Sequence, residues 1–320
     1  MSARPQRADA GWTAQAERSN LWLPRLMRWI AVTAGRPAAR LVLHPITLYF
    51  LLAHGQARRA SAQYLARALG RPVGWRDRYR HLHRFAATVL DRVYLLRGDF
   101  DRFRVTDDGV DALSAPLQRG EGILMVGAHL GSFEALRASA QGRGARVAML
   151  MYEDNARLIN ATLSAVAPHA ELHTIALGRP GAMLALRRWL DDGGLAGLLA
   201  DRTLPAQSDR SRAVAMEFLG SPALFSDGPF RLAALLRRRV VFMAGLYHGG
   251  PHYELKFVEL ADFRDGAPGH GEPSDQRVLD ALRRYVQLLE SLCRESPYNW
   301  FNFFDFWRVQ EHADAHHAPP

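Results

Sequence analysis

Hydrophobic residues follow two alternating patterns through the middle of the chain. Nearly unbroken apolar runs occupy residues 123–126, 146–151 and 195–200, as is typical of strands buried on both faces of a sheet. Between these runs, the residues from Ser132 onward and residues 183–190 place apolar side chains at helical spacing. Because strand and helix alternate, the pattern predicts an α/β fold with a mixed, mostly parallel central sheet flanked by helices.

Further elements are expected on both sides of this alternating region. Strands are predicted at residues 103–105, 171–175, 240–247 and 253–259, and helices at 109–117, 155–165, 230–236 and 276–294. The last two strands are close enough in sequence to form a hairpin across residues 248–252. A hairpin is antiparallel, so it makes the sheet mixed.

The chain is expected to divide into four parts. Residues 1–19 are polar and are predicted to be disordered, and residues 20–100 form a helical region. Within that region Gly70-Arg71-Pro72 separates two helices, the second of them beginning at about Trp75. The α/β domain is expected at residues 101–310, followed by a disordered tail at 311–320.

The segment from Asn20 has the composition of a helix that lies in a membrane interface. Arg25 and Arg28 lie off a helical face that consists of Trp22, Leu23, Leu26, Trp29 and Ile30. Such a helix places its apolar face at the acyl boundary and its cations on anionic head groups. A helix packed on the protein's own core fits the pattern equally well. The longest apolar run, residues 41–53, is interrupted by His44 and Pro45 and is shorter than the roughly 20 residues of a spanning helix.

The net charge indicates which partners the chain can bind, and the cysteine content indicates whether it can form disulfides. The formal net charge is +9, and Lys256 is the only lysine, so arginine carries the basicity. Arginine binds phosphate and carboxylate groups through two hydrogen bonds, which suits anionic head groups. The arginines are scattered and accompany no nucleic-acid-binding motif, so no nucleic-acid partner is expected. The single Cys293 excludes an internal disulfide framework.

The candidate chemistry lies where the apolar run at 123–126 ends. His129 follows that strand, and Glu134 follows His129 by five residues, in the first turn of the helix that Ser132 is expected to cap. In open α/β sheets, ligands bind at this carboxyl edge of the strands. The position therefore makes His129 a candidate for a functional residue.

The spacing between the two residues suggests a catalytic dyad. On one helix, residues five apart point about 140° away from each other. With His129 in the turn and Glu134 on the helix, the carboxylate is expected to swing back to the imidazole and make it a better base. The bare His-x4-acid pattern is weak, because His270 and Asp275 match it within a Gly/Pro-rich loop.

The block VGAHLGSFEALRA, residues 126–138, resembles the catalytic block of the bacterial lysophospholipid acyltransferase superfamily. It is most similar to the lipid A late-acyltransferase branch with its His-x4-Glu motif. The resemblance extends from about Trp22 to Trp307 and includes EFLGSPA at 217–223 and the closing segment SPYNWFNFFDFW at 296–307. In that segment the family usually has basic residues after the tryptophan, where this chain has Asn302 and aromatic residues.

The resemblance implies further binding residues. A related arginine in the family helps to hold a phosphate-bearing substrate, which assigns Arg179 to that role. The family has an acid, often followed by glutamine, after a later strand; here Asp201 and Arg202 stand at that place. Gly131 and Ser132 are expected to bind substrate, because backbone N–H groups near Gly131 to Phe133 are free at the helix start to hold an oxyanion.

The resemblance also implies the reaction. An acyl group is expected to pass from a thioester of acyl carrier protein or coenzyme A to a hydroxyl or amine of a membrane lipid or glycolipid. His129 acts as general base and Glu134 orients it, and neither a metal nor a bound cofactor is expected. The acceptor is a lipid A precursor or another lipid, and the enzyme is expected at the cytoplasmic face of the inner membrane. The alternative is a non-catalytic, membrane-associated lipid-binding subunit with the same fold.

Overall fold

A seven-stranded sheet forms the centre of the protein. The computed structural model describes residues 29–152, 173–202, 213–264 and 273–307. The strand order is β1-β9-β8-β2-β5-β3-β4, and every neighbouring pair is parallel except β8 and β9. The predicted mixed, mostly parallel sheet is therefore confirmed. The strands are β1 (Arg104–Asp108), β2 (Ile123–Gly131), β3 (Val147–Tyr152), β4 (His173–Leu177), β5 (Leu195–Leu199), β8 (Arg239–Gly249) and β9 (His252–Asp262).

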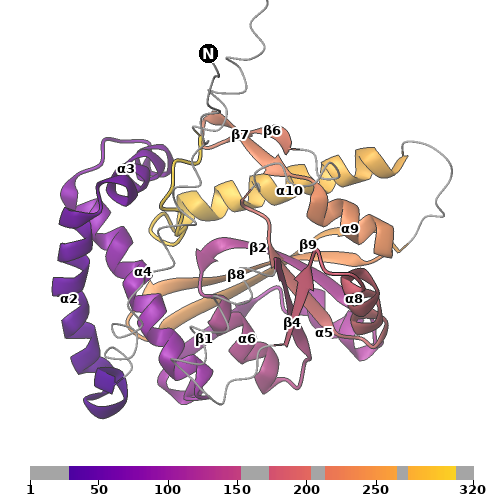
Figure 1. Cartoon of the computed structure of the whole chain (residues 1–320), viewed down its shortest axis with the longest axis horizontal. Helices are drawn as coiled ribbons and strands as arrows, with labels where there is room; N and C mark the ends of the chain where they lie inside the picture. The colour runs from indigo at the N-terminus through magenta and orange to yellow at the C-terminus, as the bar shows by residue number, and fades with distance from the viewer. Residues whose placement is uncertain (1–28, 153–172, 203–212, 265–272, 308–320) are drawn as a thin grey trace, which may run out of the picture.

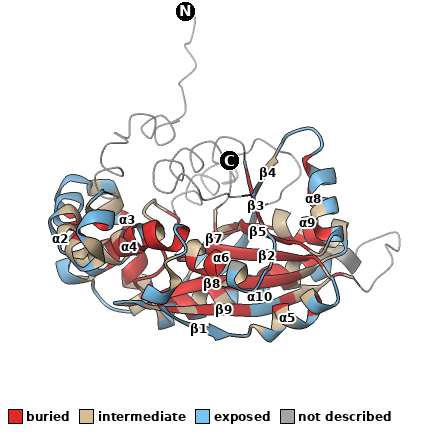
Figure 2. Ribbon diagram, turned by 90° about the horizontal axis from the view of Figure 1, so that it is seen from below, coloured by how far each residue is buried: buried red, intermediate tan, exposed pale blue. Residues whose placement is uncertain are grey.

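Helices cover both faces of the sheet (Figure 1). One face packs against α8 (Ala182–Asp191), α9 (Gly228–Leu236) and α10 (Pro273–Glu295). The other face packs against α5 (Asp111–Gln118) and α6 (Phe133–Gly142). The strand residues beneath these helices are largely buried, and they appear red along the strands in Figure 2.

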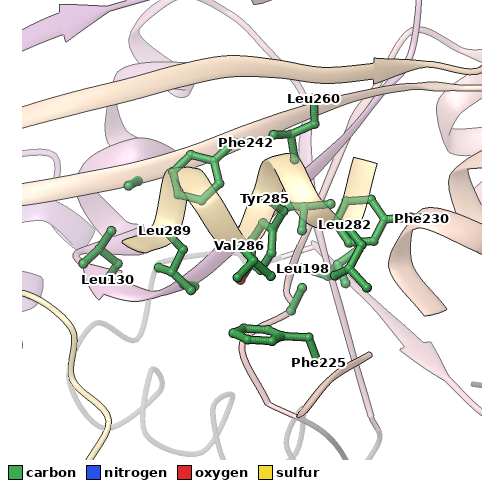
Figure 3. Close-up of a cluster of buried hydrophobic side chains, with 14 of the residues drawn as sticks. Leu130, Leu198, Phe225, Phe230, Phe242, Leu260, Leu282, Tyr285, Val286 and Leu289 are labelled. Atoms are coloured by element: carbon green, nitrogen blue, oxygen red, sulfur yellow. The ribbon is translucent and has the colours of Figure 1, made fainter. Parts of the chain in front are cut away.

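The core beneath α10 reaches the strand that carries His129. Tyr285 of α10 is fully buried and packs among Phe225, Phe230 and Phe242 (Figure 3). Its hydroxyl donates a hydrogen bond to the carbonyl of Gly127 at 3.0 Å. A buried tyrosine needs a partner for its hydroxyl, and here that partner fixes β2 two residues before His129.

Three helices form a layer at one end of the sheet (Figure 1): α2 (Gly35–Ala53), α3 (Gly55–Leu69) and α4 (Trp75–Leu96). Helix α3 ends at Gly70, whose φ of 62° is left-handed, as the prediction of a helix stop there requires. Arg84 of α4 donates to the carbonyl of Tyr247 at 2.6 Å, which ties the layer to β8. Among the described residues, no helix is long and apolar enough to cross a membrane.

A small hairpin, β6 (Ala213–Phe218) and β7 (Ser221–Ser226), escaped the sequence prediction. Its two-residue turn places Leu219 at φ 53° and Gly220 at φ 76°. Two positive φ angles are the geometry of a tight hairpin turn, but leucine is rarely found there. The backbone N–H of Leu219 donates to the Glu290 carboxylate at 2.9 Å, so a contact from α10 stabilises the turn.

Several predictions fall on residues that the structure leaves undescribed. They are the disordered termini at 1–19 and 311–320, the helix at 155–165, and most of the apolar helical face that begins at Trp22. Of that face, Trp29 and Ile30 are described and are helical.

Candidate functional site

The candidate site lies where two neighbouring parallel strands end. Strands β2 and β5 pair in register up to Gly127 and Leu199. His129 and Asp201 each follow this last pair by two residues, so the parallel pairing carries them to the same point of the sheet edge. The sequence predicted Asp201 as a substrate-binding residue. In the structure its carboxylate is hydrogen-bonded to His129.

Asp201 holds His129 through two hydrogen bonds. Its Oδ1 lies 2.8 Å from Nδ1 of the imidazole, and its Oδ2 accepts from the backbone N–H of His129 at 2.9 Å. The Nε1–H group of Trp300 donates to the same Oδ2 at 2.8 Å. The carboxylate is 1% exposed, whereas the imidazole is 29% exposed. The acid is thus enclosed and fully bonded, and the histidine reaches solvent.

The environment keeps Asp201 ionised. Burial alone raises the pKa of a carboxyl group, but attraction to His129 and the hydrogen bonds from it outweigh burial and lower the pKa of Asp201 to about 2. An ionised carboxylate can only accept hydrogen bonds, so the imidazole must present a proton on Nδ1. The lone pair of the neutral ring then lies on Nε2, which makes no hydrogen bond within the described part of the chain.

Glu134 does not contact the imidazole, so the predicted His129–Glu134 pair is wrong. The Glu134 carboxylate forms an ion pair with Arg92 of α4 at 2.6 Å and accepts a hydrogen bond from the Ser132 hydroxyl at 3.3 Å. The cause is the length of β2, which continues to Gly131. His129 is therefore held in an extended strand next to Asp201, while Glu134 lies in the first turn of α6 and faces a guanidinium, a stronger partner for a carboxylate than a neutral imidazole.

Ser132 caps α6 as predicted, since its hydroxyl accepts from the N–H of Ala135 at 3.3 Å. Of the N–H groups near Gly131 to Phe133 that were expected to hold an oxyanion, those of Gly131 and Ser132 are already bonded within the fold. Gly131 donates to the carbonyl of Asn299 at 2.8 Å, and Ser132 donates to the carbonyl of Gly245 at 2.7 Å. Both N–H groups are hydrogen-bonded within the fold because the end of β2 lies between β8 and the C-terminal segment.

Arg202 lies at the site, beside Asp201. Its guanidinium carbon is 5.2 Å from the centre of the Phe304 ring, a cation–π distance. Burial lowers the pKa of Arg202, and the neighbouring charge of Asp201 opposes that shift. A cation next to the acid that binds His129 is suited to an anionic group, and its role in substrate binding stays a prediction.

Arg179 lies on the same edge of the sheet but outside this group. It is exposed in the turn between β4 and α8. Strands β5 and β3 separate β4 from β2, and three strand spacings amount to about 14 Å. Arg179 is thus placed to meet a distant part of a large substrate rather than the reacting atoms.

Sequence reasoning missed the part that the C-terminal segment plays. Leu130 and Trp300 form an antiparallel bridge, and the N–H of Phe301 donates to the carbonyl of His129 at 2.7 Å. The amide of Asn299 bonds to both backbone groups of Tyr247. Trp300 of this segment is fully buried in the core, and it also donates to Asp201. The signal available in the sequence was a tryptophan whose buried N–H requires an acceptor.

His81 of α4 contacts the C-terminal segment at Trp300. It is fully buried, and its ring nitrogens bond to the Ser61 hydroxyl and the Trp300 carbonyl, both at 2.9 Å. Burial lowers the pKa of His81 to about 4 despite the bond to Trp300. The neutral imidazole thus joins α3, α4 and the C-terminal segment, which is a structural role.

An apolar cavity of about 270 Å³ lies between α5, α6 and the sheet. Phe133, the residue that opens α6 four positions after His129, forms part of its wall. Most of the remaining wall is apolar and includes Leu113, Leu117, Met125, Leu136, Val147 and Phe257. The cavity suits a hydrocarbon group.

A scan against protein-family models and a search of curated proteins return no match for this chain. The geometry of the site therefore carries the functional argument.

Proposed function

We propose that the protein is an acyltransferase that moves a fatty acyl group from a thioester to a hydroxyl or amine of a membrane lipid. The observation that carries this proposal is the buried Asp201 carboxylate 2.8 Å from Nδ1 of His129, which leaves Nε2 as a base at the carboxyl edge of the sheet. The resemblance of residues 126–138 to the late-acyltransferase block supports the same reaction. The donor would be a thioester of acyl carrier protein or coenzyme A.

In the proposed reaction, Nε2 of His129 takes the proton of the acceptor as its oxygen or nitrogen attacks the thioester carbonyl. Asp201 stabilises the imidazolium, because its ionised carboxylate touches the ring at Nδ1. The C–S bond of the tetrahedral adduct then breaks, and the imidazolium returns its proton to the leaving thiolate. No covalent acyl-enzyme is required.

The surroundings of the dyad fit an amphiphilic substrate. The apolar cavity behind Phe133 offers space for the acyl chain. Arg202 beside the dyad, and Arg179 further along the edge, would hold the anionic part of the acceptor. Glu134 would act at a distance, because its ion pair with Arg92 fixes the start of α6 against α4.

The outer face of α2 supports contact with a membrane surface. Leu41, Tyr49 and Leu52 are 70%, 63% and 68% exposed. They lie on the side of α2 opposite Ala39, Leu43 and Leu51, which are buried against α4. A helix that is apolar on both sides needs a second apolar surface against its exposed side. We place this face on the cytoplasmic side of the inner membrane, where lipid acceptors such as a lipid A precursor would be reached.

The alternative proposal is a lipid-binding subunit that keeps the fold and does not catalyse. The exposed face of α2 fits both proposals, whereas the ordered His129–Asp201 pair favours catalysis. The test is single-turnover transfer of a radiolabelled acyl group from a thioester into membrane lipid, with wild type beside His129→Ala. We expect label in one lipid, whose identity names the acceptor, and a rate about 10²-fold or more lower in the variant. Equal labelling by both would exclude His129 as the base, and vesicle binding without labelling would favour the subunit.

A further inference from the structure

A groove lined by arginine and histidine side chains lies in the helical layer, away from His129. It has a volume of about 710 Å³ and separates the middle of α2 from the first turns of α4. His44 lines it from α2, and Arg76, Tyr79, Arg80 and His83 line it from α4. The groove has no part in the acyl-transfer chemistry proposed above.

The imidazoles and the phenol of this groove form one stacked group. Nδ1 of His44 lies 2.5 Å from the Tyr79 hydroxyl, and the rings of His44 and His83 stack with their centres 4.7 Å apart. Nε2 of His83 is shut off from solvent and has no hydrogen-bond partner within the described ranges. A buried polar atom without a partner is uncommon and calls for an explanation. The ring thus has capacity for a hydrogen bond that the described residues do not use.

The arginines of the groove are not paired with acids. Arg76 and Arg80 are exposed, and each lies over an aromatic ring: Trp75 at 5.7 Å and Tyr298 at 5.1 Å. Neither forms an ion pair with any carboxylate of the described residues. Arg71, which is also exposed, differs in this respect, since it pairs with Asp77. The groove therefore combines two available guanidinium groups with two imidazoles, a donor set for an anion.

The groove opens beside the exposed apolar face of α2. Leu48, which is 47% exposed, lines the groove and also belongs to that face. Trp75 lines the groove from α4 and is 60% exposed. An exposed tryptophan and a leucine beside arginines are typical of a surface at the level of lipid head groups.

We propose that this groove binds the phosphate of an anionic phospholipid head group while the outer face of α2 rests on the acyl boundary of the same leaflet. The inference rests on the membrane contact in the proposed function, but not on the acyl-transfer step. It assigns Arg76 and Arg80 to the phosphate oxygens, with the His83 ring beside them in the wall of the groove. The site would orient the helical layer, and with it the edge that carries His129, relative to the membrane.

A bound phosphate would change the protonation of His83. In its absence, burial lowers the pKa of His83 to about 4, and the positive charges of His44, Arg40 and Arg84 act in the same direction. Tyr79 faces the ring as a neutral group, and Arg76 and Arg80 complete the charged surroundings. An anion favours the protonated ring, so binding takes up a proton. Affinity for anionic vesicles should therefore rise as the pH falls from 7 towards 4.

The experiment measures binding of the full chain to vesicles of phosphatidylcholine alone and of phosphatidylcholine with phosphatidylglycerol. We compare Arg76→Gln/Arg80→Gln with Arg187→Gln/Arg283→Gln, which removes the same charge from exposed positions on α8 and α10. We expect the groove variant to lose about 10-fold or more of its affinity for the anionic vesicles, and the control variant to lose less than about 3-fold. His44→Asn/His83→Asn should abolish the rise in affinity at low pH.

The outcomes separate this site from the proposed function. Equal losses of affinity in the two arginine variants would exclude the groove as a specific site. They would mean that the vesicles attract the protein through its net charge. If wild type binds both kinds of vesicle equally, the membrane contact stands and the head-group site fails. If wild type binds neither, both fail, whatever the result of the acyl-transfer assay. Competition by millimolar inorganic phosphate as effective as anionic vesicles would overturn the lipid assignment and identify a free-phosphate site.

Discussion

His129 and Asp201 are 72 residues apart in the sequence, and Oδ1 of the acid lies 2.8 Å from Nδ1 of the imidazole. The pairing arises because β2 and β5 are parallel neighbours that end together. It leaves Glu134, the acid nearest to His129 in the motif, to an ion pair with Arg92. The residue that orients the base is therefore set by sheet topology and not by the spacing of the motif.

Replacing Trp300 tests the second partner of the Asp201 carboxylate. Trp300→Phe removes the Nε1–H that donates to Oδ2 at 2.8 Å. We expect the free energy of unfolding to fall by about 2 kcal/mol, because the lost hydrogen bond ends on a buried charge. The acyl-transfer rate should fall less than in Asp201→Asn, since the bond to Nδ1 remains.

Trp307→Phe is the matched control for Trp300→Phe. Trp307 is also buried, but its Nε1 has no hydrogen-bond partner among the described residues. Urea denaturation of both variants should show the larger loss for Trp300→Phe. Equal losses would mean that the two tryptophans contribute through packing alone.

The close approach of Gly131 to Gly245 predicts a strict requirement for glycine. Gly131 has a φ of 75°, and a Cβ atom there would lie 1.9 Å from the carbonyl oxygen of Gly245. Gly131→Ala should therefore destabilise the protein by more than about 2 kcal/mol and displace His129. Gly142→Ala is the control, because a Cβ atom at Gly142 meets no atom within 4 Å. A Gly131→Ala protein with the thermal stability of wild type would contradict the described geometry.

The pH dependence of stability reports the ionisation of Asp201. Its pKa is lowered from 3.8 to about 2 in the folded protein. The folded state thus favours the ionised form, so Asp201 contributes stability above pH 4 that is lost as the pH falls towards 2. The shift corresponds to about 2 kcal/mol. The difference in free energy of unfolding between wild type and Asp201→Asn should shrink between pH 5 and pH 2, and a constant difference would exclude an ionised Asp201.

The exposed face of α2 predicts a separation of membrane binding from stability. Leu41 and Leu52 are 70% and 68% exposed, so Leu41→Ser/Leu52→Ser should change the free energy of unfolding by less than about 1 kcal/mol. The same variant should bind vesicles more weakly, because less apolar surface enters the acyl boundary. Leu43→Ser serves as the contrast, since Leu43 is 4% exposed and its replacement should destabilise the fold. Unchanged vesicle binding by the exposed-face variant would place the membrane contact elsewhere.

Much of the fold was predictable because its signals are local. Apolar runs followed by helical spacing gave the parallel strands, and Gly70-Arg71-Pro72 gave the boundary between two helices. The position of His129 at a strand end followed from the same pattern. The hairpin at Leu219 and Gly220 was not predictable, since its turn depends on a contact from Glu290 in a distant helix.

The site was only half predictable, for the same reason. His129, Asp201 and Arg202 were recognised individually, but which acid meets the imidazole depends on how far β2 continues beyond Val126. That length is fixed by Asn299 and Gly245, which accept the N–H groups of Gly131 and Ser132. Those partners come from the end of the chain and from β8, so no local sequence pattern predicts them.

The central claim is that Asp201 orients His129 and Glu134 does not, and the most direct measurement compares Asp201→Asn with Glu134→Gln in single-turnover acyl transfer. We expect Asp201→Asn to be slower than wild type by about 10²-fold or more, because the amide cannot stabilise the imidazolium. Glu134→Gln should stay within about 10-fold of wild type, since its carboxylate contacts Arg92 and Ser132 instead. A rate for Glu134→Gln as low as that of His129→Ala, with Asp201→Asn near wild type, would contradict the claim.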